Sequence, residues 1–336
     1  MSDTPFISVI ITTYNRKKYL VDAVKSAYNQ TLPKDKYEII VTKNFNDDII
    51  DSFIKEHGGR RIFFKGGTQG RQLTDALRYT KGEVICFLDD DDLFEKEKLE
   101  TIYKLFKKDT NLVYINNARH YIDENCNILF KGTNKFEKDE RVYIHGRSLF
   151  KLLKLELQNS PWYNSSSISI RKYILLKYLN VLKITNTLDL FLYLISLDSQ
   201  NNLLLLDKKL TKYRMHSSSS LSLTTYSDFK KVTLKISSSD LRISRILYKN
   251  FKRPEIKKYL KIHIREKSID YLFYKCNCRR SVLLNYILNL PYLAFARPKI
   301  NLLRGLQILL YIISPEKFRN FNYIRTKNYF LRTKSK

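Results

Sequence analysis

The chain has 336 residues, of which 43% are hydrophobic, so it is long enough to bury a sizeable core and to form two domains. With 9 Gly and 7 Pro, it is not a low-complexity or linker-rich protein. The net charge of +28 predicts an anionic partner, and the four cysteines lack the spacing of a zinc site.

The positive charge is concentrated in the last third of the chain. Residues 217–336 contain 26 Lys or Arg and 6 Asp or Glu, a net charge of +20, whereas residues 1–216 contain 35 and 27. A basic segment attracts the phosphates of nucleic acids or of lipid headgroups. The excess charge therefore belongs to a C-terminal region with a partner of its own.

Strands and helices alternate through the first 122 residues. Short apolar runs predict strands over 6–14, 37–44, 61–67, 82–88 and 112–122. Amphipathic segments between them predict helices over 16–30, 47–57, 71–80 and 95–108. Near-continuous apolar strands that alternate with such helices indicate an α/β domain, with a mostly parallel sheet covered on both faces.

The pattern changes after residue 122. We expect a helix over 147–157, a short strand and then a helix over 165–182, a helix over 187–197, and one or two strands over 202–216. Beyond residue 217 the pattern is helical throughout. Residues 281–319 are apolar, but prolines and basic residues interrupt them before the roughly 20 apolar residues of a membrane span. Two interpretations stay open for this segment, amphipathic helices on a bilayer surface and an ordinary helical subdomain with a basic face.

Four aspartates follow the strand predicted over 82–88, in the stretch "FLDDDD". In open α/β sheets, ligands bind outside the carboxyl ends of the strands, which is where this run falls. Mg²⁺ is commonly held by one or two carboxylates together with substrate phosphates, and the alternate residues Asp89 and Asp91 suit that geometry. The other interpretation is an acidic first turn of the next helix, which explains Asp92 but not Asp89.

Four motifs in this order resemble the GT-A glycosyltransferases of family 2. They are "SVIITTYNR" (8–16), "GTQGRQLTDALRYTKGEVICFLDDDDL" (67–93), "TLDLFLYLISL" (187–197) and "LDKKLTKYRMHSSSSLS" (206–222). The resemblance covers roughly residues 6–222, so it predicts a GT-A catalytic domain over 1–222 and an all-helical basic region over 223–336. It implies an inverting enzyme that moves a sugar from a nucleotide-diphospho-sugar to a glycan or lipid-linked acceptor, with Mg²⁺ or Mn²⁺ as cofactor.

The resemblance assigns one group of residues to the nucleotide. Thr12 and Tyr14 match the end of the family's first strand, where the base is held, and Tyr14 is expected to stack on it. Asn44 stands where the family usually has an aspartate that hydrogen-bonds the base, since "KNFN" (43–46) replaces the common "DDGS" turn. Arg71 matches a position that grips the nucleotide or its phosphates.

A second group is assigned to the sugar diphosphate and its metal. Asp89 and Asp91 match the family's acidic pair, for ribose and metal respectively, and Asp90 between them is counted with the donor-binding residues. His216 matches a histidine near the metal and diphosphate. The adjacent Arg214 suggests a loop that faces phosphate.

Asp189 matches the acid of the family's "ED" motif and is expected to be the catalytic base. The usual preceding Glu is Leu188 here, so a single carboxylate is left. Without the resemblance, the residues alone favour a helix cap for Asp189, because it opens an otherwise apolar helix.

Two other functions stay open at this point. The basic C-terminal region is compatible with a nucleic-acid-binding protein, although no aromatic-basic RNA signature or zinc finger supports it. The lost "DDGS" turn and the missing Glu are compatible with a non-catalytic sugar-nucleotide-binding relative. Because no basic segment precedes the first apolar run, we expect a cytoplasmic protein, peripheral on an anionic inner membrane face.

Overall fold

The computed structural model describes residues 4–130, 140–143, 162–216, 225–275, 284, 310–311 and 313–332. The described residues up to 215 belong to one compact unit and those from 216 onward to a second. The predicted helix over 147–157, the predicted boundary between 222 and 223 and most of the segment 281–319 lie outside the described residues.

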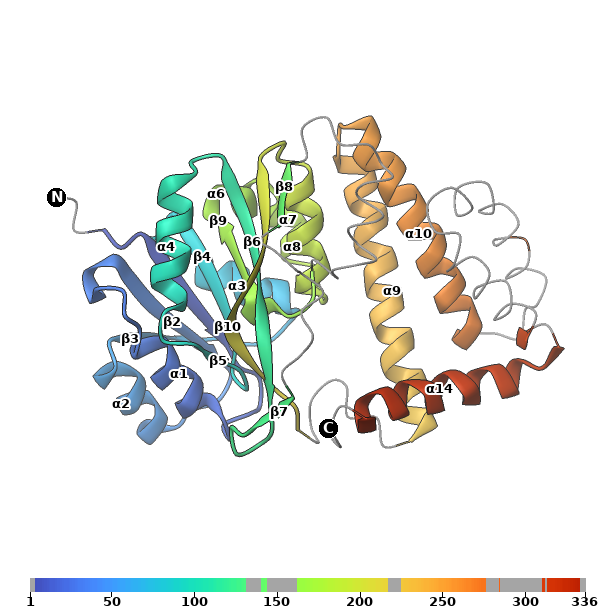
Figure 1. Cartoon of the computed structure of the whole chain (residues 1–336), viewed down its shortest axis with the longest axis horizontal. Helices are drawn as coiled ribbons and strands as arrows, with labels where there is room; N and C mark the ends of the chain where they lie inside the picture. The colour runs from blue at the N-terminus through green and yellow to red at the C-terminus, as the bar shows by residue number, and fades with distance from the viewer. Residues whose placement is uncertain are drawn as a thin grey trace. The chain divides into compact units, whose positions relative to one another are not determined.

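The first unit is built on one ten-stranded sheet with the order β3-β2-β1-β4-β9-β6-β10-β5, to which β7 adds beside β6 and β8 beside β10 (Figure 1). The strands are β1 (Ile7–Thr12), β2 (Tyr37–Lys43), β3 (Gly59–Phe63), β4 (Val84–Asp89), β5 (Leu93–Phe94), β6 (Leu112–Ile122), β7 (Ile128–Phe130), β8 (Glu140–Tyr143), β9 (Ile168–Arg171) and β10 (Asn202–Arg214).

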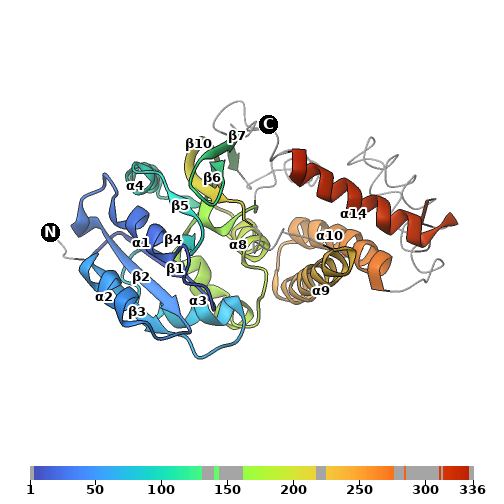
Figure 2. The same cartoon turned by 90° about the horizontal axis from the view of Figure 1, so that it is seen from below.

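The first half of the sheet is parallel, as the alternation of strands and helices predicts. β3, β2, β1 and β4 pair in parallel, and α1 (Leu20–Tyr28), α2 (Asp48–Glu56) and α3 (Gln69–Leu77) connect them in the chain, whereas α4 (Lys98–Lys108) follows β5. Val9 packs in one core with residues of α1, α2 and α4, while its neighbour Ile10 is buried on the other face. Because successive strand residues point to opposite faces, such strands are apolar at every position. Helices lie on both sides of the sheet in Figure 2.

The second half of the sheet is mixed. β9 runs antiparallel to both β4 and β6 and inserts between them, so that Ser169 pairs with Cys86 on one side and Ile115 on the other. A short 3₁₀ turn, η2 (Ser165–Ser167), leads into β9, and α6 (Lys172–Lys177), α7 (Leu179–Leu182) and α8 (Leu188–Leu197) follow it. The strand was expected from its apolar pattern, but its direction depends on pairing with strands about 80 and 50 residues earlier.

Every regular element in the described part of the second unit is a helix. It contains α9 (Tyr226–Asn250), α10 (Pro254–Lys275) and α14 (Pro315–Arg332), which contact one another pairwise. Phe229 on α9, Phe273 on α10 and Phe318 on α14 join Tyr274 and Tyr311 in one aromatic core. None of the helices in the described part of the chain combines the length and apolar character that a membrane crossing requires.

Candidate active site

The carboxyl ends of β1, β2 and β4 lie side by side. Thr12, the last residue of β1, is in register with Thr42 on β2 and with Asp89 at the end of β4. This pairing places the half-buried Thr12 directly beside the first aspartate of the acidic run. The sheet therefore brings two predicted donor-binding residues, about 80 positions apart in the chain, to its ligand-binding edge.

Asp89 is held by the turn that precedes β9. Its Oδ2 accepts a hydrogen bond of 2.6 Å from Ser165 Oγ, and its backbone N–H donates to Ser166 Oγ at 3.0 Å. Burial raises the pKa of Asp89 well above its usual range, and the negative charges of Asp92, Asp91 and Asp189 raise it further. The carboxyl groups that raise this pKa gather around Asp89 from β4 and α8.

The second and third aspartates share a cation. Asp90 is buried, and its Oδ2 accepts hydrogen bonds from Thr13 Oγ1 at 2.7 Å and from Arg16 Nε at 2.9 Å. Arg16 also reaches Asp91, with 2.8 Å between Arg16 Nη2 and Asp91 Oδ2. The Asp90 carboxylate is thus used to fix the loop that carries Tyr14, while the side chain of Asp91 keeps 15% of its surface exposed.

Asp92 is 1% exposed and ties two distant segments together. Its Oδ1 accepts the backbone N–H of Arg214 at 2.9 Å, and its Oδ2 accepts Asn164 Nδ2 at 2.9 Å. Burial raises the pKa of Asp92 to about 7. The expectation that Asp92 serves only as an acidic first turn is wrong, because it precedes β5 and its carboxylate bonds to β10 and the η2 turn.

Arg214 does not face phosphate, in contrast to the expectation from "YRMH". The residue is 1% exposed, and its guanidinium donates to the carbonyl oxygens of Asp91 at 2.8 Å and Glu124 at 2.7 Å. It lies over the Tyr19 ring at 4.4 Å. Through its hydrogen bond to the Asp91 carbonyl oxygen, Arg214 holds the backbone of the acidic run in place.

Replacing this guanidinium should unfold the site. Arg214→Met leaves the carbonyl oxygens of Asp91 and Glu124 without this donor and removes a buried cation from beside the carboxylates. We expect the free energy of unfolding to fall by about 3–5 kcal/mol, measured by urea denaturation. Arg214→Lys keeps the charge without the planar fork, so it should recover part of the loss. Wild-type stability in Arg214→Met would show that Asp92 and Asn164 fix the run without it.

Asp189 lies in the first turn of α8 and bonds to the η2 segment. Its Oδ2 accepts the backbone N–H of Asn164 at 3.1 Å, and its charge is near enough to raise the pKa of Asp89. The N-cap residue of α8 is Thr187, and no side chain caps that helix end. The helix-cap interpretation of Asp189 is therefore wrong, and the predicted base lies near the acidic run.

Asn164 connects Asp189 to Asp92. Its backbone N–H bonds to Asp189, its side-chain amide donates to Asp92, and its Oδ1 accepts the N–H of Ser167 at 3.1 Å. Its φ of 70° lies in the left-handed region, which Asn tolerates better than most residues. Sequence reasoning missed Asn164, and a lone Asn before three serines gives little signal of such a role.

Two substitutions distinguish the contribution of the Asn164 side chain from that of its left-handed backbone conformation. Asn164→Gly keeps the left-handed backbone and loses only the amide, whereas Asn164→Ala also adds the left-handed strain. We expect the free energy of unfolding of the alanine variant to be about 1 kcal/mol lower than that of the glycine variant. Chemical denaturation of both variants measures the difference. Equal stability would mean that the turn relaxes and that φ at this position is not fixed by the fold.

A buried lysine supports the same turn. Lys98 on α4 has no exposed surface, and its Nζ donates to the carbonyl oxygen of Ser166 and to Thr211 Oγ1, the latter at 3.0 Å. Burial lowers the pKa of Lys98 to about 7. Neither Lys98 nor Arg16 was singled out from the sequence, because a lysine in a charged helix and an arginine after "TTYN" both read as surface residues.

The nucleotide side of the site is formed by loops after β1, β2 and β3. Tyr14 is 56% exposed, with its ring 6.5 Å from that of Phe64. Asn44 bonds to the neighbouring loop, accepting the N–H of Asn15 at 2.8 Å and donating to Asn15 Oδ1 at 2.6 Å. In this structure Asn44 therefore fixes the loop that presents Tyr14.

Arg71 lies close to Phe64, the ring that Tyr14 also contacts. A Cβ built on Gly67 would be 3.4 Å from Arg71 Cγ and 3.7 Å from Phe64 Cζ, so the three residues adjoin. The guanidinium is exposed and pairs with Asp75 at 3.2 Å. Gly66 and Gly67 have φ of 124° and 131°, which only glycine adopts readily. Phe64 is 3% exposed, so Tyr14 and Arg71 both adjoin a buried aromatic ring.

Gly70 joins the nucleotide side to the helix that carries Asp189. A Cβ at this position would lie 1.7 Å from the carbonyl oxygen of Leu182, and the Gly70 N–H donates to Thr185 O at 2.9 Å. This close approach requires glycine and fixes α3 against the segment before α8.

His216 is buried and lies two residues beyond the end of β10. It falls with the second compact unit, so its expected place beside a metal stays a prediction.

The described residues contain no group of three or more His, Cys, Asp and Glu side chains arranged as metal ligands. Their chemistry nevertheless fits a divalent cation that a diphosphate helps to hold. Five carboxylates, of Asp89 to Asp92 and Asp189, lie close together, and nearby cations are Arg16, Arg214 and Lys98. The resulting excess of negative charge, made of hard oxygen donors, suits Mg²⁺ or Mn²⁺.

An acidic run at the end of β4, a loop aromatic after β1 and a carboxylate at the start of α8, all on this sheet, define a GT-A fold glycosyltransferase. The model of glycosyl transferase family 2 matches residues 8–176, about half of the chain, and the chain belongs to that family. The resemblance predicted from the sequence, the fold class and the enzyme class are thereby confirmed.

Curated relatives are similar over the same region. An uncharacterized glycosyltransferase of Methanocaldococcus jannaschii is 32% identical over 165 residues, which cover 44% of this chain and 57% of that protein. Chondroitin synthase of Escherichia coli is 30% identical over 135 residues, 39% of this chain and 19% of that protein. The chain thus spans well under two thirds of the length of these relatives.

Two solved structures share the fold over almost the whole chain. Residues 1–349 of Staphylococcus aureus TarS, in complex with UDP-GlcNAc, cover 97% of this chain and 91% of that one, with a TM-score of 0.54 and 16% identity. The mannosyltransferase PcManGT of Pyrobaculum calidifontis, in complex with GDP-Man and Mn²⁺, covers 98% and 86%, with a TM-score of 0.55 and 12% identity.

Proposed function

We propose that this chain transfers a sugar from a nucleotide-diphospho-sugar to an acceptor hydroxyl, with inversion at the anomeric carbon. One observation carries the proposal. The first-turn carboxylate of α8, Asp189, lies close enough to Asp89 to raise its pKa, and Asn164 bonds to both Asp189 and Asp92. A base is thereby positioned beside a cluster suited to a charged diphosphate.

The donor nucleotide would occupy the edge formed by the ends of β1, β2 and β4. Tyr14 would stack on the base, with Arg71 nearby beside Phe64, and Thr12 and Asp89 would lie at the ribose. Asn44 would contact the base only through the edge that its bonds to Asn15 leave available. The TarS complex with UDP-GlcNAc supports a nucleotide sugar as ligand of this fold.

Asp91 would hold the metal ion, with His216 and the diphosphate oxygens as further ligands. Bound Mg²⁺ or Mn²⁺ supplies charge stabilisation for the departing diphosphate. Arg16 pairs with both Asp90 and Asp91, so it neutralises part of their charge. The Mn²⁺ in the PcManGT complex supports a divalent cation.

Asp189 would act as general base. Its Oδ2 is fixed by the Asn164 N–H, and the carboxylate would take the proton of the acceptor hydroxyl as the oxygen attacks the anomeric carbon. The bond to the diphosphate breaks on the opposite side, which inverts the configuration.

We propose a glycan or a lipid-linked glycan as acceptor, and a peripheral location on the inner face of the cell membrane. The net charge of +20 in residues 217–336 supports an anionic surface as partner. The names of relatives, chondroitin synthase and poly(ribitol-phosphate) β-N-acetylglucosaminyltransferase, support a surface polysaccharide as the product class.

The proposal is tested with a panel of nucleotide sugars, including UDP-GlcNAc and GDP-mannose, with Mg²⁺, with Mn²⁺ and with EDTA. Release of nucleoside diphosphate is measured with and without added glycan acceptors. We expect one donor to be turned over only with a divalent cation. Donor binding without turnover in every acceptor mixture would instead identify a non-catalytic relative.

A further inference from the structure

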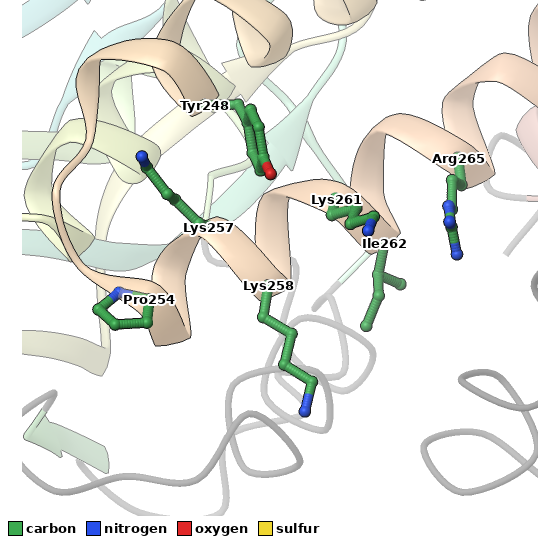
Figure 3. A pocket seen from close by; sticks show the side chains of 7 residues that line it. All are labelled: Tyr248, Pro254, Lys257, Lys258, Lys261, Ile262 and Arg265. Atoms are coloured by element: carbon green, nitrogen blue, oxygen red, sulfur yellow. The ribbon is translucent and has the colours of Figure 1, made fainter.

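The second unit carries a basic pocket where α9 ends and α10 begins. Its volume is about 390 Å³, and it is lined by Tyr248, Pro254, Lys257, Lys258, Lys261, Ile262 and Arg265 (Figure 3). Four of the seven lining residues are cations and none is acidic.

The cations of the pocket share one face of α10. Lys257, Lys261 and Arg265 follow at intervals of four residues, and Lys258 lies three residues before Lys261. Side chains at these spacings are neighbours on a helix, and like charges there destabilise it. These cations therefore form a stripe of like charges on α10, and a bound anion would reduce the repulsion between them.

The described residues give Lys257, Lys258 and Lys261 no acidic partner within ion-pair distance, whereas Lys267, farther along α10, lies 3.9 Å from Asp240. Lys258 and Lys261 are exposed, and the Lys257 ammonium lies 5.7 Å from the Tyr248 ring centroid. These three charges are available to a ligand.

The stripe lies near the N-terminus of α10, which makes the electrostatic potential at the pocket more positive. Pro254 is the first residue of α10, and the free amides of a first helical turn carry partial positive charge. Lysines so near this end add to that charge, which Glu255 in the same turn offsets only in part. Tyr248 and Ile262 supply a hydroxyl and an apolar wall beside the cations.

We propose that this pocket binds a phosphate group, carried either by an anionic lipid headgroup or by a soluble phosphorylated molecule. Compact cations, a helix N-terminus and a hydroxyl together favour a multiply charged oxyanion. The site acts independently of the transfer reaction proposed above, so its test does not need an active enzyme.

The full chain is titrated calorimetrically with inorganic phosphate and with glycerol 3-phosphate. In a second arm it is co-sedimented with vesicles of phosphatidylcholine that contain or lack phosphatidylglycerol. In whichever of the two experiments the wild-type chain binds, the triple variant Lys257→Gln, Lys258→Gln, Lys261→Gln should bind about a hundredfold more weakly. The matched triple variant Lys230→Gln, Lys231→Gln, Lys235→Gln removes equal charge from α9 and should stay within about threefold of wild type.

Saturable binding of free phosphate would identify a soluble ligand, and binding confined to phosphatidylglycerol vesicles would identify a lipid headgroup. The proposal is overturned if neither arm shows binding. It is equally overturned if the control triple weakens binding as much as the pocket triple, since total charge would then explain the effect. Circular dichroism of both triples confirms that α9 and α10 are formed.

Discussion

Asp189→Asn should lower kcat for sugar transfer by about 10²–10⁴-fold, the range expected when a general base is lost. The amide has the same shape and still accepts the Asn164 N–H through its oxygen, so the η2 turn should keep its place. It cannot take the acceptor's proton. KM for the donor should change little, because Asp189 faces the acceptor side of the proposed reaction. Steady-state kinetics with the donor identified in the panel measure both constants.

Asp48→Asn is the matched control for this variant. Asp48 is also an aspartate in the first turn of a helix, but it is exposed on α2. It should leave kcat unchanged. If Asp189→Asn kept wild-type turnover, the base would have to be another group, and the structural bridge through Asn164 would be the only role left for Asp189.

Asp91→Asn should abolish the response to metal. The variant keeps the size of the side chain, but an uncharged amide replaces the carboxylate that pairs with Arg16. It therefore removes the negative charge that binding of a divalent cation requires. We expect transfer to fall by about 10²–10³-fold, and donor affinity to become the same with Mn²⁺ and with EDTA. Calorimetric titration of the donor under both conditions measures this coupling.

Asp90→Asn provides the contrast, because Asp90 is buried under Thr13 and Arg16. Its loss should lower stability more than Asp91→Asn does, and the remaining activity should still depend on the metal. An Asp91→Asn enzyme with full, metal-dependent activity would remove Asp91 from the metal site. A large drop in its thermal midpoint would mean that Asp91 is a structural residue.

For the acidic run, the sequence predicts the location but not the role of each carboxylate. Its place at the end of an apolar strand predicts that it lies at the ligand-binding edge, because strand order along the chain fixes where parallel strands end. Its four carboxylates look alike in the sequence, yet the fold uses them differently. Asp90 and Asp92 hold loops, and Asp89 and Asp91 face the edge. That division depends on Thr13, Arg16 and Arg214, which come from other segments.

Asn44 and Arg214 show the same limit in side chains that the motifs had singled out. The position of Asn44 after β2 follows from the strand pattern, but its bonds to Asn15 depend on the facing loop. Arg214 reads as a surface cation beside a histidine, yet it is buried because Asp91 and Glu124 offer carbonyl oxygens beneath the site. Local sequence contains no information about such partners, which are 29 residues away for Asn44 and 90 or more for Arg214.

By itself, the sequence determined the main strands and helices up to residue 122, the parallel half of the sheet and the family, because periodicity and motif spacing are properties of neighbouring residues. It did not predict β5, β7 or β8, or the division of the helix expected within 165–182 into α6 and α7. Only the tertiary structure decided that β9 enters antiparallel between β4 and β6 and carries the η2 turn to the acidic run. It alone joined Asp92, Asn164 and Asp189 into one network, since hydrogen bonds between distant segments form only when packing brings their atoms within about 3 Å.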